Sequence, residues 1–289
     1  MFSVVVVVHD SAPELRVLLD SLARVRLAPQ LVVVDSGSRD EGAELARAWG
    51  AEVLVPGGNV GFGAACNLGV AAARSDVTVL LNPDCELLDG ALAALAALAA
   101  AGGLHAPRLL NADGSVQRSA HPLPGTVGAV AGALVHPPLL PAPLRDRLEP
   151  YRAASARTVG WAIGACLAAP TEVLRRLGPF DPSVHLFAED MELCLRARAL
   201  EIPTVLHPEL AIRHAGGHST LRSGEPFELL ARRRREAIES ALGTRARRLD
   251  DLAQALTFAS RAAAHAVLGG DSARPRAQLA ALRDARRRA

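Results

Sequence analysis

Polar side chains stand directly after three predicted β-strands in the first part of the chain. In chain order they are His9 and Asp10, then Asp35 and Ser36, then Asn82 and Asp84. A carboxylate offers several acceptor sites, so Asp35 is suited to hydrogen bonds from a nucleobase or a ribose. Asp84, beside the Asn82 amide, is suited to Mg²⁺ or Mn²⁺, which bind carboxylate oxygens together with substrate phosphates. The alternative for both aspartates is capping of a turn or a helix.

A glycine-rich segment, Asn59–Asn67, opens a predicted helix after the third strand. Glycine at position 63 allows either close approach of the backbone to a ligand or a tight contact between helix and sheet. Cys66 occupies the third glycine position of the dinucleotide-binding fingerprint, so that fingerprint is not satisfied. Gly63 and Asn67 are therefore candidates for ligand binding without a dinucleotide assignment.

Two acidic residues and one histidine in the second half are further candidates. Glu189 and Asp190 begin a predicted amphipathic helix. Acids at that position are stabilised by the helix dipole, and the functional alternative is a general base for a hydroxyl group. His214 follows a predicted short strand and precedes a polar loop, where it could complete a metal or diphosphate site or serve a structural role.

Alternating strands and helices must position these side chains. Strands are predicted at 2–8, 31–34, 52–55 and 77–81, and helices at 13–25, 41–49, 63–73 and 88–101. This alternation predicts an α/β fold with a mostly parallel, doubly wound sheet. Ligands of such sheets bind beyond the carboxyl ends of the strands. Residues 121–156, rich in Pro and Ala, are expected to be irregular, on the surface or over the site.

The composition excludes several classes of protein. All 32 basic residues are Arg, and the absence of Lys excludes lysine Schiff-base chemistry and an ordinary P-loop ATPase. A net charge of +2 gives nucleic-acid binding little electrostatic support, so no nucleic-acid partner is expected. Four dispersed cysteines are typical of reduced thiols in a cytoplasmic protein. No signal peptide and no transmembrane segment are predicted.

The end of the chain differs in charge from the rest. Residues 222–289 hold fifteen arginines against eight acidic residues and are predicted to form a helical extension after a domain at 1–221. Basic clusters lie at 232–235, 245–248 and 286–288. They favour peripheral contact with the anionic inner face of the cell membrane. The alternative is a helical face that packs on the core or on a second subunit of a homodimer.

In their order along residues 2–220, the motifs of the chain resemble those of the family-2 inverting glycosyltransferases. Within that family the rhamnosyltransferase-like branch, which builds bacterial cell-wall glycans, is the most similar. The motifs are Val4–Asp10, Val32–Asp40, Asn59–Gly69, Asn82–Asp84, Gly164–Cys166, Gly178–Asp181, Glu189–Arg196 and His214–Ser219. The resemblance implies a GT-A type nucleotide-binding fold, a nucleotide-diphosphate-sugar donor and a glycan or polyprenyl-linked acceptor.

The resemblance also implies roles for single residues. Asp190 is expected to be the catalytic base. Glu189 beside it is expected to support the position of Asp190 and to contribute contacts to the acceptor. Asp84 and His214 are expected to hold Mg²⁺ or Mn²⁺ at the diphosphate. The expected nucleotide-sugar contacts are His9, Asp10, Asp35, Ser36, Gly63, Asn67 and Asn82. The expected acceptor side comprises Trp161, Gly164 and Glu189.

Some positions depart from the family pattern, and other functions stay open. His185 and Ala188 replace aromatic residues, Thr171 replaces a basic residue and Glu192 replaces Asp. These changes lie near the acceptor side, so they bear on the acceptor rather than on the reaction. One alternative is an inactive relative that binds nucleotide sugars or acts as a scaffold. A sugar-nucleotide nucleotidyltransferase would need a glycine-rich, basic loop near the N-terminus, which residues 9–14 lack.

Overall fold

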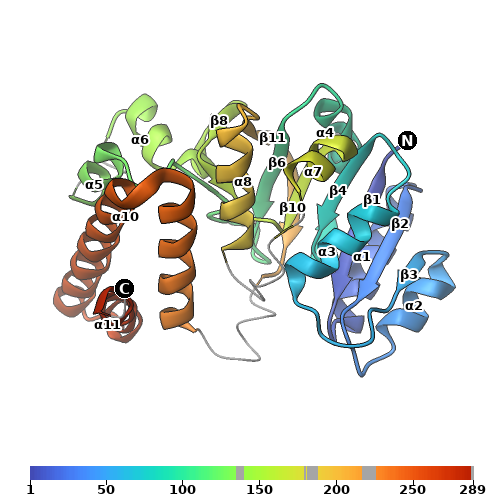
Figure 1. The fold of residues 1–289 in the computed structure, drawn as a ribbon, viewed down its shortest axis with the longest axis horizontal. Coiled ribbons are helices and arrows are strands. Elements are labelled where there is room, and N and C mark those ends of the chain that lie inside the picture. The colour runs from blue at the N-terminus through green and yellow to red at the C-terminus, as the bar shows by residue number, and fades with distance from the viewer. Residues whose placement is uncertain (135–139, 179, 181–187, 217–225, 288–289) are drawn as a thin grey trace.

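The computed structural model describes residues 1–134, 140–178, 180, 188–216 and 226–287 (Figure 1). The predicted boundary at residue 221 lies outside the described residues. So do His185 and the ends of two motifs, Asp181 and Ser219. No described helix is both long and apolar enough to cross a membrane.

Four parallel strands form the first half of the sheet. They are β1 (Ser3–Val8), β2 (Gln30–Asp35), β3 (Glu52–Leu54) and β4 (Val77–Leu81). They lie in the order β3-β2-β1-β4. Val4 and Val6 pack into one hydrophobic core and Val5 into the other, because successive side chains of a strand point to opposite faces. The predicted α/β architecture with parallel strands buried on both faces is confirmed.

The second half of the sheet is mixed. Its strands are β5 (Cys85–Leu87), β6 (Leu104–Leu110), β8 (Arg157–Val159), β10 (Cys166–Pro170) and β11 (Thr204–His214). β10 runs antiparallel between β4 and β6, and β11 is parallel to β6 but antiparallel to β5 and β8. The two short strands predicted around 204–213 are one strand, β11, with a register shift between His207 and Ala211.

Helices cover both faces of the sheet. They are α1 (Ala12–Arg24), α2 (Gly42–Trp49), α3 (Phe62–Ala72), α4 (Ala91–Ala99), α7 (Thr171–Leu177) and α8 (Glu189–Ala199). Leucines of α1 and α4 pack into one core, and apolar residues of α3, α7 and α8 pack into the other. The sheet is therefore enclosed on both sides, and the ends of its strands are left to carry the polar residues.

The segment expected to be irregular contains regular elements. It holds β7 (Ala120–His121), which pairs with β9 (Trp161–Ala162), the helices α5 (Val127–Leu134) and α6 (Ala142–Leu148), and a 3₁₀ turn, η2 (Pro150–Arg152). The expectation of an irregular segment was wrong for these residues. None of the residues of α5 is buried, so an apolar but exposed helix carried no amphipathic signal in the sequence.

The chain ends in the predicted helical extension. α10 (Phe227–Leu268) is broken at Gly243, where φ is 83° and ψ is 171°, and α11 (Ala273–Arg287) follows. A φ of that sign suits glycine, which lacks a Cβ atom. α10 packs against α8, α5 and α11, and Figure 1 shows these helices beside α8, on the side away from β1–β3. The extension is thus joined to the helix that begins with Glu189 and Asp190.

Candidate active site

The loops after β1 and β2 interlock through hydrogen bonds. His9 Nδ1 lies 2.9 Å from the backbone oxygen of Ser36, and the backbone N–H of Val60 donates to Ser36 Oγ at 3.1 Å. Asn59 Nδ2 lies 3.4 Å from His9 Nε2. The predicted nucleotide contacts His9 and Ser36 are therefore brought together, and Asn59 joins them. Asn59 was not predicted as a site residue, although it opens the glycine-rich segment.

Both predicted aspartates of these loops bond to backbone groups. Asp35, which is 7% exposed, accepts the backbone N–H of Ser38 at 2.8 Å. Asp10, in a left-handed conformation with φ of 51°, accepts the N–H of Arg39 at 2.6 Å. One oxygen of Asp35 thus performs the capping role that the sequence left open, and one oxygen of Asp10 makes a similar bond to the neighbouring loop. The two acids fix the loops and keep further acceptor capacity.

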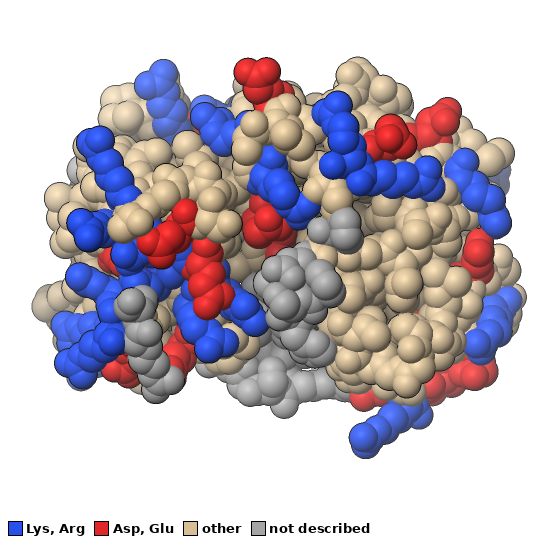
Figure 2. Space-filling view, viewed as in Figure 1, with Lys and Arg blue, Asp and Glu red and all other residues tan. Residues whose placement is uncertain are grey.

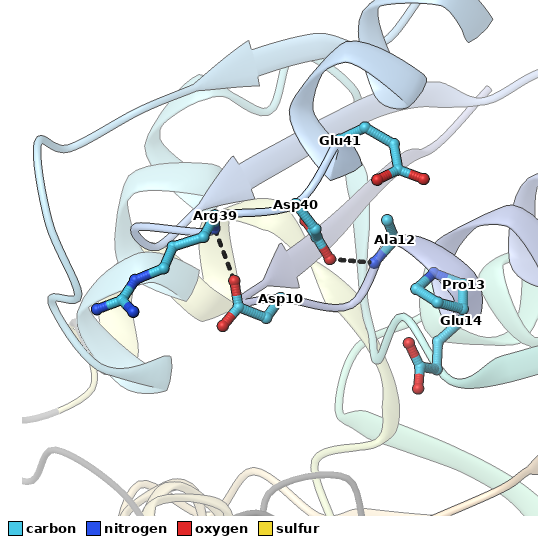
Figure 3. A pocket seen from close by; sticks show the side chains of 7 residues that line it. All are labelled: Asp10, Ala12, Pro13, Glu14, Arg39, Asp40 and Glu41. Carbon is cyan, nitrogen blue, oxygen red and sulfur yellow. Dashed lines mark hydrogen bonds between the residues drawn. The ribbon is translucent and has the colours of Figure 1, made fainter.

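A cavity of about 390 Å³ lies beside Asp10. It is lined by Asp10, Ala12, Pro13, Glu14, Arg39, Asp40 and Glu41. Figure 3 shows the carboxylates of Asp10 and Asp40, each turned toward a backbone N–H. Four carboxylates against one guanidinium make this cavity unfavourable for a diphosphate, because like charges repel. Of the predicted nucleotide contacts only Asp10 lines it, so this cavity does not mark the diphosphate position.

Gly63, in the first turn of α3, and Asn67, in the middle of that helix, both lie against Phe180. A Cβ atom on Gly63 would lie 2.7 Å from Phe180 Cβ, so glycine is required for the helix to pack there. Asn67 Nδ2 donates to the Phe180 backbone oxygen at 2.9 Å, and Asn67 Oδ1 accepts the Phe180 N–H at 2.7 Å. Of the two interpretations of Gly63, tight packing is therefore the one that accounts for its missing side chain.

Asp84 and His214 are brought together although 130 positions separate them in the chain. β11 ends at His214, which pairs with Cys85 of β5, directly after Asp84. Asp84 Oδ1 lies 3.2 Å from His214 Nε2, and the two side chains are 6% and 9% exposed. Asp84 Oδ2 accepts the N–H of Gly216 at 3.0 Å. Burial opposes ionisation of Asp84. The His214 ring, which donates Nε2–H when both of its nitrogens are protonated, and the N–H of Gly216 outweigh burial and hold the pKa of Asp84 below the usual value.

Gln117 determines which nitrogen of His214 carries a proton. Gln117 Nε2 donates to Asn111 Oδ1 at 3.0 Å, so Gln117 Oε1 faces His214 Nδ1 at 2.8 Å. Because an amide oxygen only accepts, Nδ1 is the protonated nitrogen of the neutral ring. The lone pair on Nε2 then points toward Asp84, and the Asn82 amide lies 3.3 Å from the same nitrogen. Nothing in the sequence indicated this role for Gln117.

An imidazole lone pair and a carboxylate that face each other are suited to a shared divalent cation. Among the described residues no group of three His, Cys, Asp or Glu side chains could hold a metal ion, so this part of the chain supplies few ligands. Mg²⁺ keeps waters and substrate phosphates among its ligands, so two protein ligands are sufficient for a site completed by a diphosphate. The residues present therefore fit the predicted cation, with Gln117 as the outer hydrogen-bond partner that orients the histidine.

Glu189 and Asp190 begin α8, and the backbone before them is unusual. Ala188 is left-handed, with φ of 66°. Asp190 Oδ2 accepts the N–H of Gly164 at 3.1 Å, and Oδ1 accepts that of Met191 at 2.7 Å. Burial raises the pKa of Asp190 despite these bonds. Burial, and secondarily repulsion by Asp190, raises the pKa of Glu189 to about 8. The pair is thus suited to holding one proton near neutral pH.

Backbone hydrogen bonds join the cation candidates to the acidic pair. The N–H of Asn82 donates to the oxygen of Ala165 at 2.8 Å, and Gly164, the preceding residue, donates to Asp190. A Cβ atom on Gly164 would lie 3.4 Å from Asp190 Cβ, so the backbone approaches the carboxylate closely. The loop at 164–165 therefore holds Asn82 on one side and Asp190 on the other.

Trp161, predicted on the acceptor side, stacks on His121 of β7. The ring centroids are 4.0 Å apart and the planes 11° from parallel. Burial, followed by the nearby charges of Arg234 and Arg118, lowers the pKa of His121 to about 3, so the ring is neutral. Arg234, on α10, lies 3.7 Å from Met191 Sδ and pairs with Asp250 at 2.7 Å. Neither residue was predicted as a site residue, because His121 lies in the segment expected to be irregular and Arg234 lies in the arginine cluster at 232–235.

Comparison with known proteins adds to this geometry. A family model described as glycosyl transferase family 2 matches residues 3–118. N-acetylglucosaminyl-diphospho-decaprenol L-rhamnosyltransferase of Mycobacterium tuberculosis is 31% identical over 242 residues, which cover 76% of this chain and 77% of the relative.

Two solved structures share the fold. The mannosyltransferase PcManGT from Pyrobaculum calidifontis, in complex with GDP-Man and Mn²⁺, has a TM-score of 0.60 at 18% identity, covering 97% of this chain and 79% of that one. S. aureus TarS, residues 1–349, in complex with UDP-GlcNAc, has a TM-score of 0.53 at 15% identity, covering 91% and 72%. At such low identity these likenesses show the fold alone.

Proposed function

Because the chain belongs to glycosyl transferase family 2 and is a rhamnosyltransferase-like glycosyltransferase with a GT-A type fold, we propose that it transfers a sugar from a nucleotide-diphosphate donor to a polyprenyl-linked glycan, with inversion. Rhamnose is the first donor sugar to test, because the mycobacterial relative is named as a rhamnosyltransferase. A decaprenol-linked sugar in the same name supports the acceptor class. The acceptor would bring the enzyme to the inner face of the membrane. The homodimer stays a prediction.

Asp84 and His214, with Asn82 beside them, would hold Mg²⁺ or Mn²⁺. When bound, the cation would neutralise the charge that develops on the departing diphosphate. The chain's own contribution is orientation: Gln117 keeps the Nε2 lone pair of His214 available, and Gly216 fixes the Asp84 carboxylate. PcManGT, which shares the fold, is in complex with GDP-Man and Mn²⁺, and this supports a divalent cation in the proposed reaction without indicating which residues hold it.

Asp190 would take the proton of the acceptor hydroxyl. A general base must be ionised and must be oriented toward that proton. The N–H groups of Gly164 and Met191 orient its carboxylate. Burial raises the pKa of Glu189 to about 8, so the Glu189–Asp190 pair would retain one proton near neutral pH. One in-line displacement of the diphosphate by the acceptor oxygen, with Asp190 as base, would invert the configuration at the anomeric carbon of the sugar. The stacked rings of Trp161 and His121 would provide an apolar surface for one face of the acceptor sugar.

The loops after β1 and β2 would bind the nucleoside, through His9, Asp10, Asp35 and Ser36. Asp35 keeps acceptor capacity beyond its bond to Ser38, which suits a base or ribose donor group. We assign Gly63 and Asn67 an indirect role, because their contacts hold Phe180 rather than an open surface.

The observation that carries this proposal is the chain of contacts from His214 through Asn82 and the 164–165 loop to Asp190. These contacts would place the proposed cation site next to the proposed base. A donor screen by calorimetry with TDP-, UDP- and GDP-sugars, with and without Mn²⁺, tests the first half, and a transfer assay with the bound donor tests the second. Donor binding without transfer to any lipid-linked acceptor would favour the alternative of an inactive nucleotide-sugar-binding relative.

A further inference from the structure

A second cavity, of about 380 Å³, lies in the C-terminal helices and is lined almost entirely by arginine. Its lining residues are Arg235, Arg247, Arg248, Asp251 and Arg286. All of them belong to α10 and α11, and none belongs to the candidate active site. At the left of Figure 2, arginine side chains gather over these helices with acidic side chains between them.

The break in α10 builds this cavity. At Gly243 the helix turns, so that residues before the break face residues after it. Arg234 pairs with Asp250, and Arg235 pairs with Asp251, across the turn. Arg247 joins Asp251 at 3.2 Å, and its Nε lies 3.1 Å from Glu239. Arg235 and Asp251 are 6% and 5% exposed, so their guanidinium and carboxylate groups are fixed before any ligand arrives.

These ion pairs leave an excess of positive charge. Asp251 is shared by two arginines, and Glu239, which is 46% exposed, contributes a second negative charge at the edge. Arg248 and Arg286 line the same cavity and are exposed. Within the described parts of the chain neither of them makes an ion pair. Arg248 and Arg286 therefore add positive charge beside the inner arginines, and these like charges repel one another.

We propose that this cavity binds a phosphate-bearing anion, separately from the sugar-transfer site. Guanidinium groups present planar pairs of N–H donors that match phosphate oxygens, and arginine is favoured where such recognition matters. The inner arginines, held by Asp251, would form the base of the site. Arg248 and Arg286 would close on the anion from its exposed side. The proposal concerns residues outside the donor and acceptor assignments and does not depend on them.

The test uses inorganic pyrophosphate as probe, in calorimetry on the full chain with EDTA present. The double variant R248A/R286A removes the two outer arginines and spares the buried pairs. R245A/R283A is the matched control, because it removes the same charge from exposed positions of the same two helices outside the cavity. We expect R248A/R286A to bind pyrophosphate at least about tenfold more weakly, and the control to stay within about twofold of the unaltered protein.

A second arm identifies the source of the phosphate. Sedimentation with phosphatidylcholine vesicles, with and without phosphatidylglycerol, is compared for the same three proteins. A loss of vesicle binding specific to R248A/R286A assigns the site to a lipid headgroup, and equal vesicle binding beside the pyrophosphate difference assigns it to a soluble phosphate compound. Absence of pyrophosphate binding to the unaltered protein, or an equal loss in both variants, would overturn the proposal.

Discussion

Replacing Asp190 by Asn should lower kcat by about 10²-fold or more and leave donor affinity within about twofold, because positioned general bases contribute about 10²–10⁴ to rate. The substitution keeps the shape of the side chain and removes its ability to accept a proton. It tests the base separately from the cation site, which lies on the other side of the 164–165 loop.

The structure allows the stability effect to be separated from the catalytic one. The Asp190 carboxylate accepts N–H groups from Gly164 and Met191, and an Asn side chain has one acceptor oxygen for the two. One N–H would lose its partner, which costs about 1–3 kcal/mol. A domain with about 5–15 kcal/mol of stability should stay folded, so a large fall in kcat reports on chemistry.

The assay is transfer from TDP-rhamnose to a polyprenyl-diphosphate acceptor with Mg²⁺, with donor affinity measured by calorimetry. The kcat of the unaltered enzyme should rise with pH as Asp190 ionises, above the range of an ordinary aspartate because burial raises its pKa. D190N should lack this acid limb. The control is E201Q, which removes the exposed carboxylate of Glu201 just beyond the end of α8, and it should behave as the unaltered protein. Full turnover in D190N, or loss of donor binding, would refute the assignment of Asp190 as base.

Three further predictions address the neighbouring groups. As pH rises from about 4.5 toward 8, the Glu189→Gln variant should become more stable relative to the unaltered protein. A carboxyl group whose pKa is raised in the folded state lowers the free energy of unfolding between its unfolded and folded pKa values, and Gln lacks that group. Urea titrations at several pH values would measure the difference, and a difference that does not change with pH would contradict the prediction. Asp84→Ala should abolish transfer and make donor binding by calorimetry independent of divalent cations, whereas unchanged turnover would disprove the cation assignment. Gln117→Ala should weaken Mn²⁺ affinity by about 10–100-fold. Gln117→Glu, which still accepts a hydrogen bond from His214 Nδ1–H, should keep most of the affinity. Equal Mn²⁺ affinities in all three proteins would show that Gln117 does not contribute to the site.

Tertiary contacts explain why several side chains escaped prediction. His121 and Gln117 stand in stretches without periodicity, and their roles depend on partners 40 and 97 positions away, Trp161 and His214. The arginine clusters show the same limit. Arg234 and Arg235 pair with aspartates across the break at Gly243, and Arg247 pairs with Asp251 on its own side of the break, while Arg248 stays exposed. A run of like residues does not show which of them face inward.

The strand-and-helix alternation of the first half could be predicted from the sequence alone, because burial on both faces requires continuous β-branched runs such as Val4–Val8. The polar residues after those strands could be predicted with it, since the ends of parallel strands meet at one edge. The pairing of Asp84 with His214 required the resemblance to a family, and its geometry required β11 to lie beside β5. The orientation of the His214 ring toward Gln117 and the raised pKa of Glu189 were decided only by tertiary structure, because hydrogen-bond partners and burial set them.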